Sequence, residues 1–279
     1  MRKLLSTFAL VLAIAGLGSQ SLSAGESAPE SVNTYLIGQM MTAEEVGAKL
    51  VDAGFEVVGT YEVNKKNKLQ TVIYTNDAMK KMASKEGRGF ASIGRILIDG
   101  ANNQISISNP VYFGKAFMQD DADFATLKSI KDSLTGVFTD LKPSSDKWVY
   151  EDLSDYQFMT MMPYYHDSAV VGEGDTAELV KKAESYKKGK LHLFTLKIAE
   201  GKYLVGYELS KRTAKFVEKI GVQNAGVLPY TILIENDEAR MLAAKYYLAV
   251  SYPQLTMTQF MKIATVPGAI EKELEKPFK

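Results

Sequence analysis

The chain has 279 residues, with 33 Lys and Arg against 33 Asp and Glu, and it contains no Cys. This charge balance lacks the basic excess that nucleic-acid binding requires, and the absence of thiols excludes cysteine catalysis, iron–sulfur clusters and disulfides. A hydrophobic content of 46% with 24% charged residues is typical of a globular protein.

The N-terminus has the pattern of an export signal. Arg2 and Lys3 precede an apolar run from Leu4 to Leu17, and small residues that end at Ala24 supply a cleavage site. The apolar run is shorter than the ~20 residues that a bilayer-spanning helix needs. We therefore expect a signal peptide at 1–24, a periplasmic or secreted protein, and no membrane insertion after cleavage.

The segment 25–119 predicts a first α+β unit. Its expected elements in chain order are a helix, two strands, a second helix and a hairpin, at 42–53, 55–63, 69–75, 76–86 and 93–108. Thr42 and Glu45 have the spacing of a capping box, and Gly54 is suited to end the first helix. Pro110 has no amide hydrogen for a ladder, so it ends the last strand of the hairpin.

The segment 120–175 predicts a helical and irregular connector. Apolar residues recur at helical spacing from Asp123 to Phe138. The stretch 142–146 contains Pro and Ser and is typical of a linker. The stretch 148–166 holds the only Trp together with closely spaced aromatic and Met residues.

The segment 176–279 predicts a second α+β unit with a C-terminal helix. Its expected elements are a helix, two strands, a helix, a hairpin and the C-terminal helix, at 176–187, 191–198, 203–208, 210–220, 229–251 and 256–276. Within the hairpin we expect strands at 229–235 and 245–251. The residues 238–244 are interpreted as an insertion that lengthens the turn between them.

Two short motifs recur at a near-constant offset along the chain. The residues Thr-Ala-Glu at 42–44 return at 176–178, and Ile-Leu-Ile at 96–98 returns at 232–234. Because the surrounding elements follow the same order, we expect an internal duplication. The predicted fold is α+β, with two similar units that each pack helices on one face of an antiparallel sheet.

The first unit shows the order helix, Gly-Phe, paired strands, helix, hairpin and Asn-Pro, from 53–58 through 105–110. The second unit has a Leu-Pro dipeptide followed by a strand at 228–234. These features resemble the α+β family called domain of unknown function 302, here in tandem over about half of the mature chain. The resemblance implies a fold and no mechanism, because that family has no established activity.

Aromatic residues near the junction of the two units predict a ligand-binding surface. The candidates are Tyr112, Phe113, Trp148, Tyr164, Tyr165, Tyr246 and Tyr247. Clefts between domains are preferred ligand sites, and aromatic rings supply much of their lining. The alternative is that these side chains pack between a sheet and its helices.

One cluster has the chemistry of a copper site. Met159, Met161, Met162 and His166 lie close together in the sequence, and thioether and imidazole ligands suit Cu(I). The alternative is that these Met side chains fill gaps in the core beneath a loop.

The sequence contains no P-loop, no Gly-x-Ser-x-Gly elbow and no His-Glu-x-x-His helix. We therefore expect a non-catalytic exported protein that binds a small ligand or a protein partner at the inter-unit surface, without a cofactor. The alternative is a hydrolase-like or other enzyme whose site is assembled from scattered Asp, Glu, Tyr and Arg residues, including Tyr74, Arg88 and Arg95.

Overall fold

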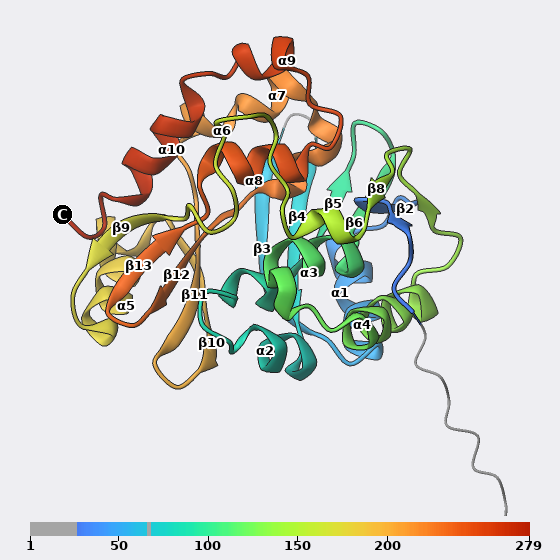
Figure 1. Cartoon of the computed structure of the whole chain (residues 1–279), viewed down its shortest axis with the longest axis horizontal. Helices are drawn as coiled ribbons and strands as arrows, with labels where there is room; N and C mark the ends of the chain where they lie inside the picture. The colour runs from blue at the N-terminus through green and yellow to red at the C-terminus, as the bar shows by residue number, and fades with distance from the viewer. Residues whose placement is uncertain (1–26, 66–67) are drawn as a thin grey trace, which may run out of the picture.

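The computed structural model describes residues 27–65 and 68–279, and the predicted signal at 1–24 lies outside these residues. Its described strands pair in antiparallel fashion and helices cover the sheets, so the fold is α+β. Among these residues, no helix combines the length and the apolar character needed to cross a membrane. Figure 1 shows the early elements, coloured blue to green, beside the late elements, coloured yellow to red.

The first sheet has six strands and belongs to the first half of the protein, the described residues up to 168. Their spatial order is β3-β4-β5-β6-β2-β7, with the bounds Glu56–Asn64, Leu69–Thr75, Gly94–Asp99, Gln104–Ser108, Tyr35–Gln39 and Lys142–Pro143. A separate two-stranded ribbon pairs β1 (Ser31–Val32) with β8 (Trp148–Val149).

The second sheet has five strands and belongs to the second half, residues 169–279. Their spatial order is β10-β11-β12-β13-β9, with the bounds His192–Ala199, Lys202–Tyr207, Tyr230–Glu235, Glu238–Met241 and Ala169–Glu173. Apart from β7, the two sheets therefore have the same strand order.

Strands β2 and β9 were not expected from the sequence. Each is the first strand of its sheet along the chain, and it pairs with the second strand of the later hairpin: β2 pairs with β6, and β9 pairs with β13. Both strands are five residues long and find partners far along the chain. Strand β9 lies inside the segment 120–175 that we predicted to be a connector.

Helices were predicted at the positions of α1, α2, α4, α5, α6, α7, α9 and α10, whereas α3 and α8 were not predicted. Their bounds are α1 Ala43–Asp52, α2 Asp77–Ala83, α3 Pro110–Met118, α4 Phe124–Val137, α5 Thr176–Ser185, α6 Lys211–Ala214, α7 Phe216–Ile220, α8 Ala244–Ser251, α9 Met257–Met261 and α10 Val266–Leu274, with 3-10 turns η1 Gly89–Ser92, η2 Gln119–Asp121, η3 Glu151–Leu153, η4 Tyr186–Gly189 and η5 Val222–Val227. Thr42 and Glu45 form the expected capping box, and Ser210 caps α6.

The prediction for the last hairpin was wrong. Residues 245–251, expected as a strand, form helix α8, and the supposed insertion at 238–244 contains the actual strand β13. Nearly all of α8 is buried, so its sequence lacks the polar face that marks a surface helix and reads as a continuous apolar strand. With this correction, each hairpin is followed by a helix, α3 in the first half and α8 in the second.

Helices α1 and α4 cover one face of the first sheet. Val46 and Leu50 of α1 and Leu134 of α4 share a buried apolar cluster with Ile96 and Ile107 of the sheet. Side chains alternate between the two faces of a strand, so Arg95, Leu97 and Ser106 lie on the opposite face. That opposite face contacts η5 of the second half.

The two halves contact each other through glycines in η1 and η5. A Cβ on Gly89 of η1 would lie 2.2 Å from a methyl carbon of Leu233 on β12. A Cβ on Gly226 of η5 would lie 3.3 Å from the Cβ of Leu97 on β5. Each half therefore places a short glycine-containing turn against the sheet of the other half, where a side chain would hold the backbones apart.

Helices α3 and α8 exchange hydrogen bonds between the halves. The Tyr112 hydroxyl on α3 donates to the Val250 carbonyl on α8 at 3.0 Å. The Tyr246 hydroxyl on α8 donates to the Ala116 carbonyl on α3 at 3.1 Å. Burial raises the pKa of both phenols well above its usual range, so both keep the proton that they donate.

These bonds satisfy carbonyls that the helices cannot satisfy themselves. The last four carbonyls of an α-helix have no partner within the helix. Helix α8 ends at Ser251, and its Ser251 carbonyl accepts a hydrogen bond from Tyr35 of the first half at 2.6 Å. Tyr35 and Tyr112 of the first half thus cap the C-terminus of α8.

Tyr112→Phe should lower the free energy of unfolding by about 1–3 kcal/mol, because it leaves the buried Val250 carbonyl without its donor. Tyr246→Phe should lower it by less, about 0.5–1.5 kcal/mol, because the Ala116 carbonyl still accepts from the Gln119 side chain. Urea unfolding followed by circular dichroism measures the loss. The matched control is Tyr186→Phe, whose hydroxyl makes no hydrogen bond with another described residue. Equal midpoints for all three variants would contradict a capping role.

Candidate functional site

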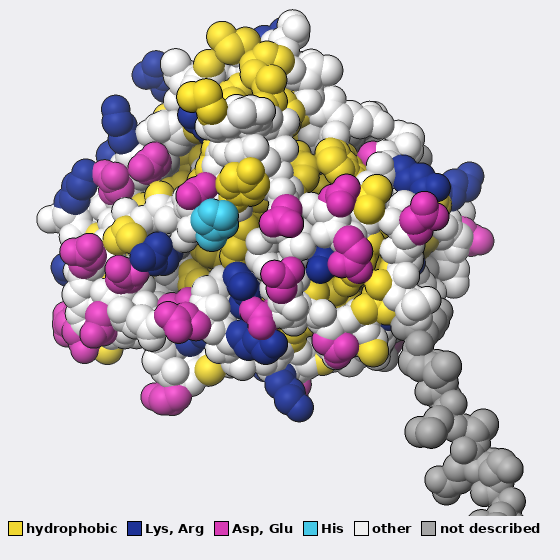
Figure 2. All heavy atoms as spheres, in the orientation of Figure 1, with side chains coloured by type: hydrophobic (Ala, Val, Ile, Leu, Met, Phe, Trp, Pro, Cys, Tyr) yellow, Lys and Arg dark blue, Asp and Glu magenta, His cyan; other side chains and the backbone are white. Residues whose placement is uncertain are grey.

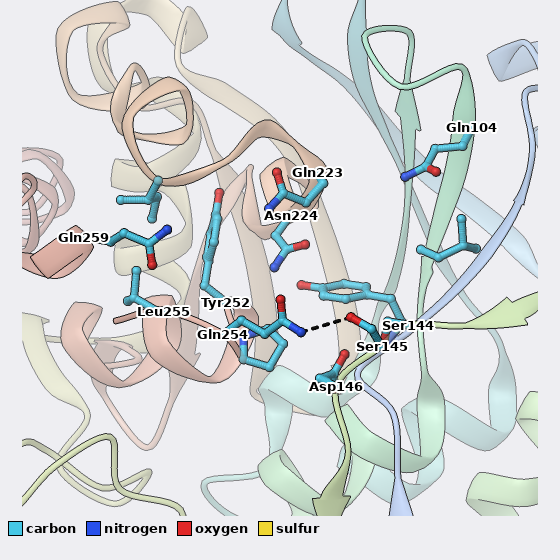
Figure 3. Close-up of a pocket in the computed structure, with 14 residues that line it drawn as sticks. Gln104, Ser144, Ser145, Asp146, Gln223, Asn224, Tyr252, Gln254, Leu255 and Gln259 are labelled. Carbon is cyan, nitrogen blue, oxygen red and sulfur yellow. Dashed lines mark hydrogen bonds between the residues drawn. The ribbon is translucent and has the colours of Figure 1, made fainter. Parts of the chain in front are cut away.

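A polar cleft opens between the two halves and has a volume of about 290 Å³. We call it the amide cleft, because five amide side chains line it: Gln104, Gln223, Asn224, Gln254 and Gln259. The rings of Tyr35 and Tyr252 and the segment 144–146 complete most of the lining. Figure 3 shows these groups around the opening.

Both halves contribute to the walls of the amide cleft. Gln104 on β6 lies on one side, whereas Gln223 and Asn224 of η5 lie across from it (Figure 3). Tyr252 and Gln254 follow the end of α8, and Gln259 lies on α9. The cleft therefore exists only where η5 and the end of α8 meet the first sheet.

Three hydrogen bonds fix the mouth of the cleft. Gln254 donates to the Ser145 hydroxyl at 3.0 Å and connects the halves, as the dashed line in Figure 3 shows. The Asp146 carboxylate accepts from the amide and the hydroxyl of Thr34, at 2.9 and 2.6 Å. The loop after β7, expected as a simple linker at 142–146, is thus a fixed wall of the cleft.

Other amides of the cleft keep their hydrogen-bonding groups available. Gln104, Gln223 and Asn224 make no side-chain hydrogen bond with another described residue. The Gln259 oxygen accepts from the Thr256 amide in the capping box of α9, which leaves the NH₂ group of Gln259 as a donor. Each uncommitted amide offers both donors and an acceptor.

The charge of the lining limits the kind of ligand. Among the described residues that line the amide cleft, Asp146 is the only charged one, and no Lys, Arg or His is present. Burial raises the pKa of Tyr35 and of Tyr252, so both phenols stay neutral. An anionic ligand would find no cation in this lining to balance its charge.

A second, larger hollow of about 440 Å³ also lies between the halves, and we call it the charged groove. Its ionisable lining residues are Glu86, Arg88, His166, Glu235, Glu238 and Arg240. Figure 2 shows acidic and basic side chains interspersed over this face of the protein, without a broad field of one sign.

A buried ion pair lies beneath the charged groove. Lys202 on β11 contacts Glu235 on β12 at 2.6 Å, with the side chains 5% and 11% exposed. The Glu235 carboxylate also accepts from the Gly87 amide at 2.8 Å, and the Lys202 ammonium donates to the Lys85 carbonyl. Lys202 and Glu235 of the second half therefore both bind the turn that follows α2 in the first half.

Arg88 is similarly committed within the groove. It donates to the Asp121 carboxylate at 2.9 Å and lies over the Tyr165 ring. The Tyr165 hydroxyl donates to the Gly87 carbonyl at 2.6 Å. The groove walls thus consist mainly of groups that are already paired with each other, which is the pattern of a structural contact.

Most of the predicted aromatic ligand residues meet in the core between the halves. Tyr112, Tyr165, Tyr246 and Tyr247 are buried, and Phe113 and Trp148 pack against them or against neighbouring rings. Phe113 lies 5.7 Å from Tyr35 and Tyr165 lies 5.9 Å from Tyr246, measured between ring centroids. None of the predicted aromatic residues lines the amide cleft.

The predicted copper ligands lie in an exposed segment. Met161 is 94% exposed and Met159 is also exposed, whereas Met162 packs partly against the core. His166 stacks on Tyr164, with ring centroids 5.4 Å apart. Copper binding stays a prediction. In the part of the chain that the structure describes, no three His, Asp or Glu side chains form a metal-holding group.

The residues suggested for an enzyme are not all in one cavity. Arg88 lines the charged groove, whereas Tyr74 and Arg95 are buried residues of strands β4 and β5 in the first sheet. The amide cleft was not found from the sequence. Its one local signal is the Gln223-Asn224 pair, which begins two residues after Gly221 and places a polar turn within a buried region.

Searches with protein-family models, among curated proteins and among solved structures gave no match to this chain. The resemblance to domain of unknown function 302 thus stays a prediction.

Lys202→Met should lower the free energy of unfolding by about 3–5 kcal/mol, because it leaves Glu235 buried without its cation. Chemical denaturation measures this change. Lys197→Met is the matched control, since Lys197 pairs at 2.6 Å with Glu200 in solvent and its loss should not shift the midpoint measurably. If the two variants lost equal stability, the Lys202–Glu235 pair would not be what holds the turn after α2 against the second half.

Proposed function

We propose that this protein binds a small, neutral, polyhydroxylated ligand of the size of a monosaccharide in the amide cleft. The observation that carries the proposal is the set of uncommitted amides of Gln104, Gln223 and Asn224 in a lining that contains no cation. A sugar hydroxyl both donates and accepts, and a carboxamide offers the complementary donors and acceptor.

The size and position of the cleft support the same proposal. Its volume of about 290 Å³ is near the lower end of the range for small-molecule sites, ~300–1,000 Å³. Such sites occur preferentially between domains, and this cleft has one wall from each half. The Tyr35 and Tyr252 rings add apolar surface for the C–H faces of a sugar ring.

The sequence pattern supports two further proposals, one about where the protein is located and one about how the chain arose. We infer an exported protein, periplasmic or secreted, built by internal duplication of a unit similar to domain of unknown function 302. The equal strand order of the two sheets supports the duplication. Extracytoplasmic binding of a neutral solute needs no cofactor, which is consistent with the lack of a catalytic motif in the sequence.

Asn224→Ala and Gln223→Ala should each weaken sugar binding by about 2- to 10-fold, since a neutral hydrogen bond contributes about 0.5–1.5 kcal/mol. Isothermal titration calorimetry with neutral hexoses, pentoses and polyols gives the dissociation constants, with uronic acids and sugar phosphates as charged comparisons. Gln70→Ala on β4 is the control, because Gln70 lies outside the cleft lining. Absence of binding by the neutral panel, or preference for the charged sugars, would overturn the proposal.

Export predicts that the mature protein recovered from the periplasm or medium begins at Gly25. Intact-mass spectrometry of the fractionated protein checks the cleavage site. Leu12→Arg in the apolar run should retain the full-length chain in the cytoplasm, because it interrupts the signal core. A full-length protein of wild-type sequence that stays in the cytoplasm would contradict the export proposal.

A further inference from the structure

A buried arginine lies at the junction of the halves. Arg95 on β5 is 8% exposed and projects from the face of the first sheet that meets the second half. Residues of η5 and α8 surround the same region, including Val227 and Tyr247. The cation is therefore enclosed between the two halves.

The contacts of Arg95 leave its charge without a counter-ion from the protein. One terminal nitrogen donates to the Pro229 carbonyl at 3.4 Å, and the guanidinium lies 5.7 Å from the centroid of the Tyr247 ring. The buried Nε has no hydrogen-bond partner. Among the described residues, no carboxylate lies within ion-pairing distance of Arg95. A buried charge is costly unless it is paired, so this environment favours a negative partner.

A small cavity of about 20 Å³ lies beside Arg95. Ser106 on β6 and Ser251 at the end of α8 also line it, and their buried hydroxyls have no partner in the described protein. The Ser108 hydroxyl, in contrast, is bonded to the backbone of Arg95. The cavity therefore combines one unpaired cation with two unpaired hydroxyl donors.

The size of the cavity restricts its occupant. A cavity needs about 10–15 Å³ to hold one water molecule, so this cavity exceeds that minimum but suits only a small occupant. A halide is a single atom, whereas phosphate, sulfate and organic acids consist of several heavy atoms and need more space. A single negative charge also matches the single guanidinium.

We propose that Arg95, Ser106 and Ser251 bind one chloride-sized monovalent anion between the halves. The site is separate from the amide cleft, although Tyr35 lines both. Its donors come from β5 and β6 of the first half and from α8 of the second half. An anion held by all three ties the halves together. Above the dissociation constant, the folding equilibrium constant rises in proportion to the anion concentration.

The test compares unfolding of the mature protein in sodium chloride, bromide, gluconate and sulfate at equal ionic strength. The folding equilibrium constant should rise tenfold for each tenfold increase in chloride or bromide above the dissociation constant, and it should not respond to gluconate. Crystals grown in bromide should show an anomalous peak beside the Nε atom of Arg95. Sulfate raises the stability of folded proteins in general, so it is the control for that effect. Equal stability in chloride, bromide and gluconate, with no bromide peak in the cavity, would mean that water occupies it and would overturn the proposal.

Variants connect the effect to this cavity. Arg95→Met should abolish the halide dependence of stability. Ser106→Ala and Ser251→Ala should weaken this dependence, and they provide the test if Arg95→Met does not fold. Arg212→Met, at an exposed position on α6, should retain the full halide dependence. A halide dependence that survives in the two Ser variants and in Arg95→Met would place the anion elsewhere and would reject this site.

Discussion

The structure depends on the exchange of tyrosine hydroxyls between α3 and α8. The last carbonyls of an α-helix have no partner within the helix. Tyr112 donates to the Val250 carbonyl at the end of α8, and Tyr246 donates in the opposite direction to the Ala116 carbonyl near the end of α3, which also accepts from Gln119. Neither half is complete without the other, since separation would expose the tyrosines and leave the helix ends to water.

This exchange also determines where ligand chemistry can occur. It holds α8 against the first sheet, and the residues that follow α8 then face β6 and the loop after β7. The amide cleft is the hollow that remains at this edge of the junction. At another edge, the Lys202–Glu235 pair and its contacts with the turn after α2 join the halves through charges that are already matched. The junction thus has two hollows of different character: the amide cleft offers uncommitted neutral amides, whereas most charged groups of the charged groove are paired with each other.

The local parts of the fold could be predicted from the sequence, and the parts that depend on tertiary contacts could not. The capping box at Thr42 is a property of four consecutive residues, so it was recognised. Strands β2 and β9 are five residues long and pair with strands far away, so nothing near them in the sequence marked them. Helix α8 was mistaken for a strand because burial on nearly all sides removed its helical pattern. The amide cleft is lined by residues from several elements that are far apart in the sequence. Gln, Asn and Ser are common residues, so their positions in the sequence do not indicate a site unless the contact between the halves is known.

The contacts of the glycine turns have the form of an isologous interface within one chain. Gly89 meets Leu233 and Gly226 meets Leu97, so each half presents the same kind of surface to the other, as the subunits of a two-fold dimer do. In a dimer of two identical subunits, any substitution at the interface appears twice, once on each side of the two-fold axis. Because here the two surfaces belong to one polypeptide, each can vary alone: β5 carries Arg95 two residues before Leu97, whereas β12 carries Thr231 two residues before Leu233. Covalent linkage of the halves thus permits a single buried cation where a symmetric dimer would bury two that repel each other.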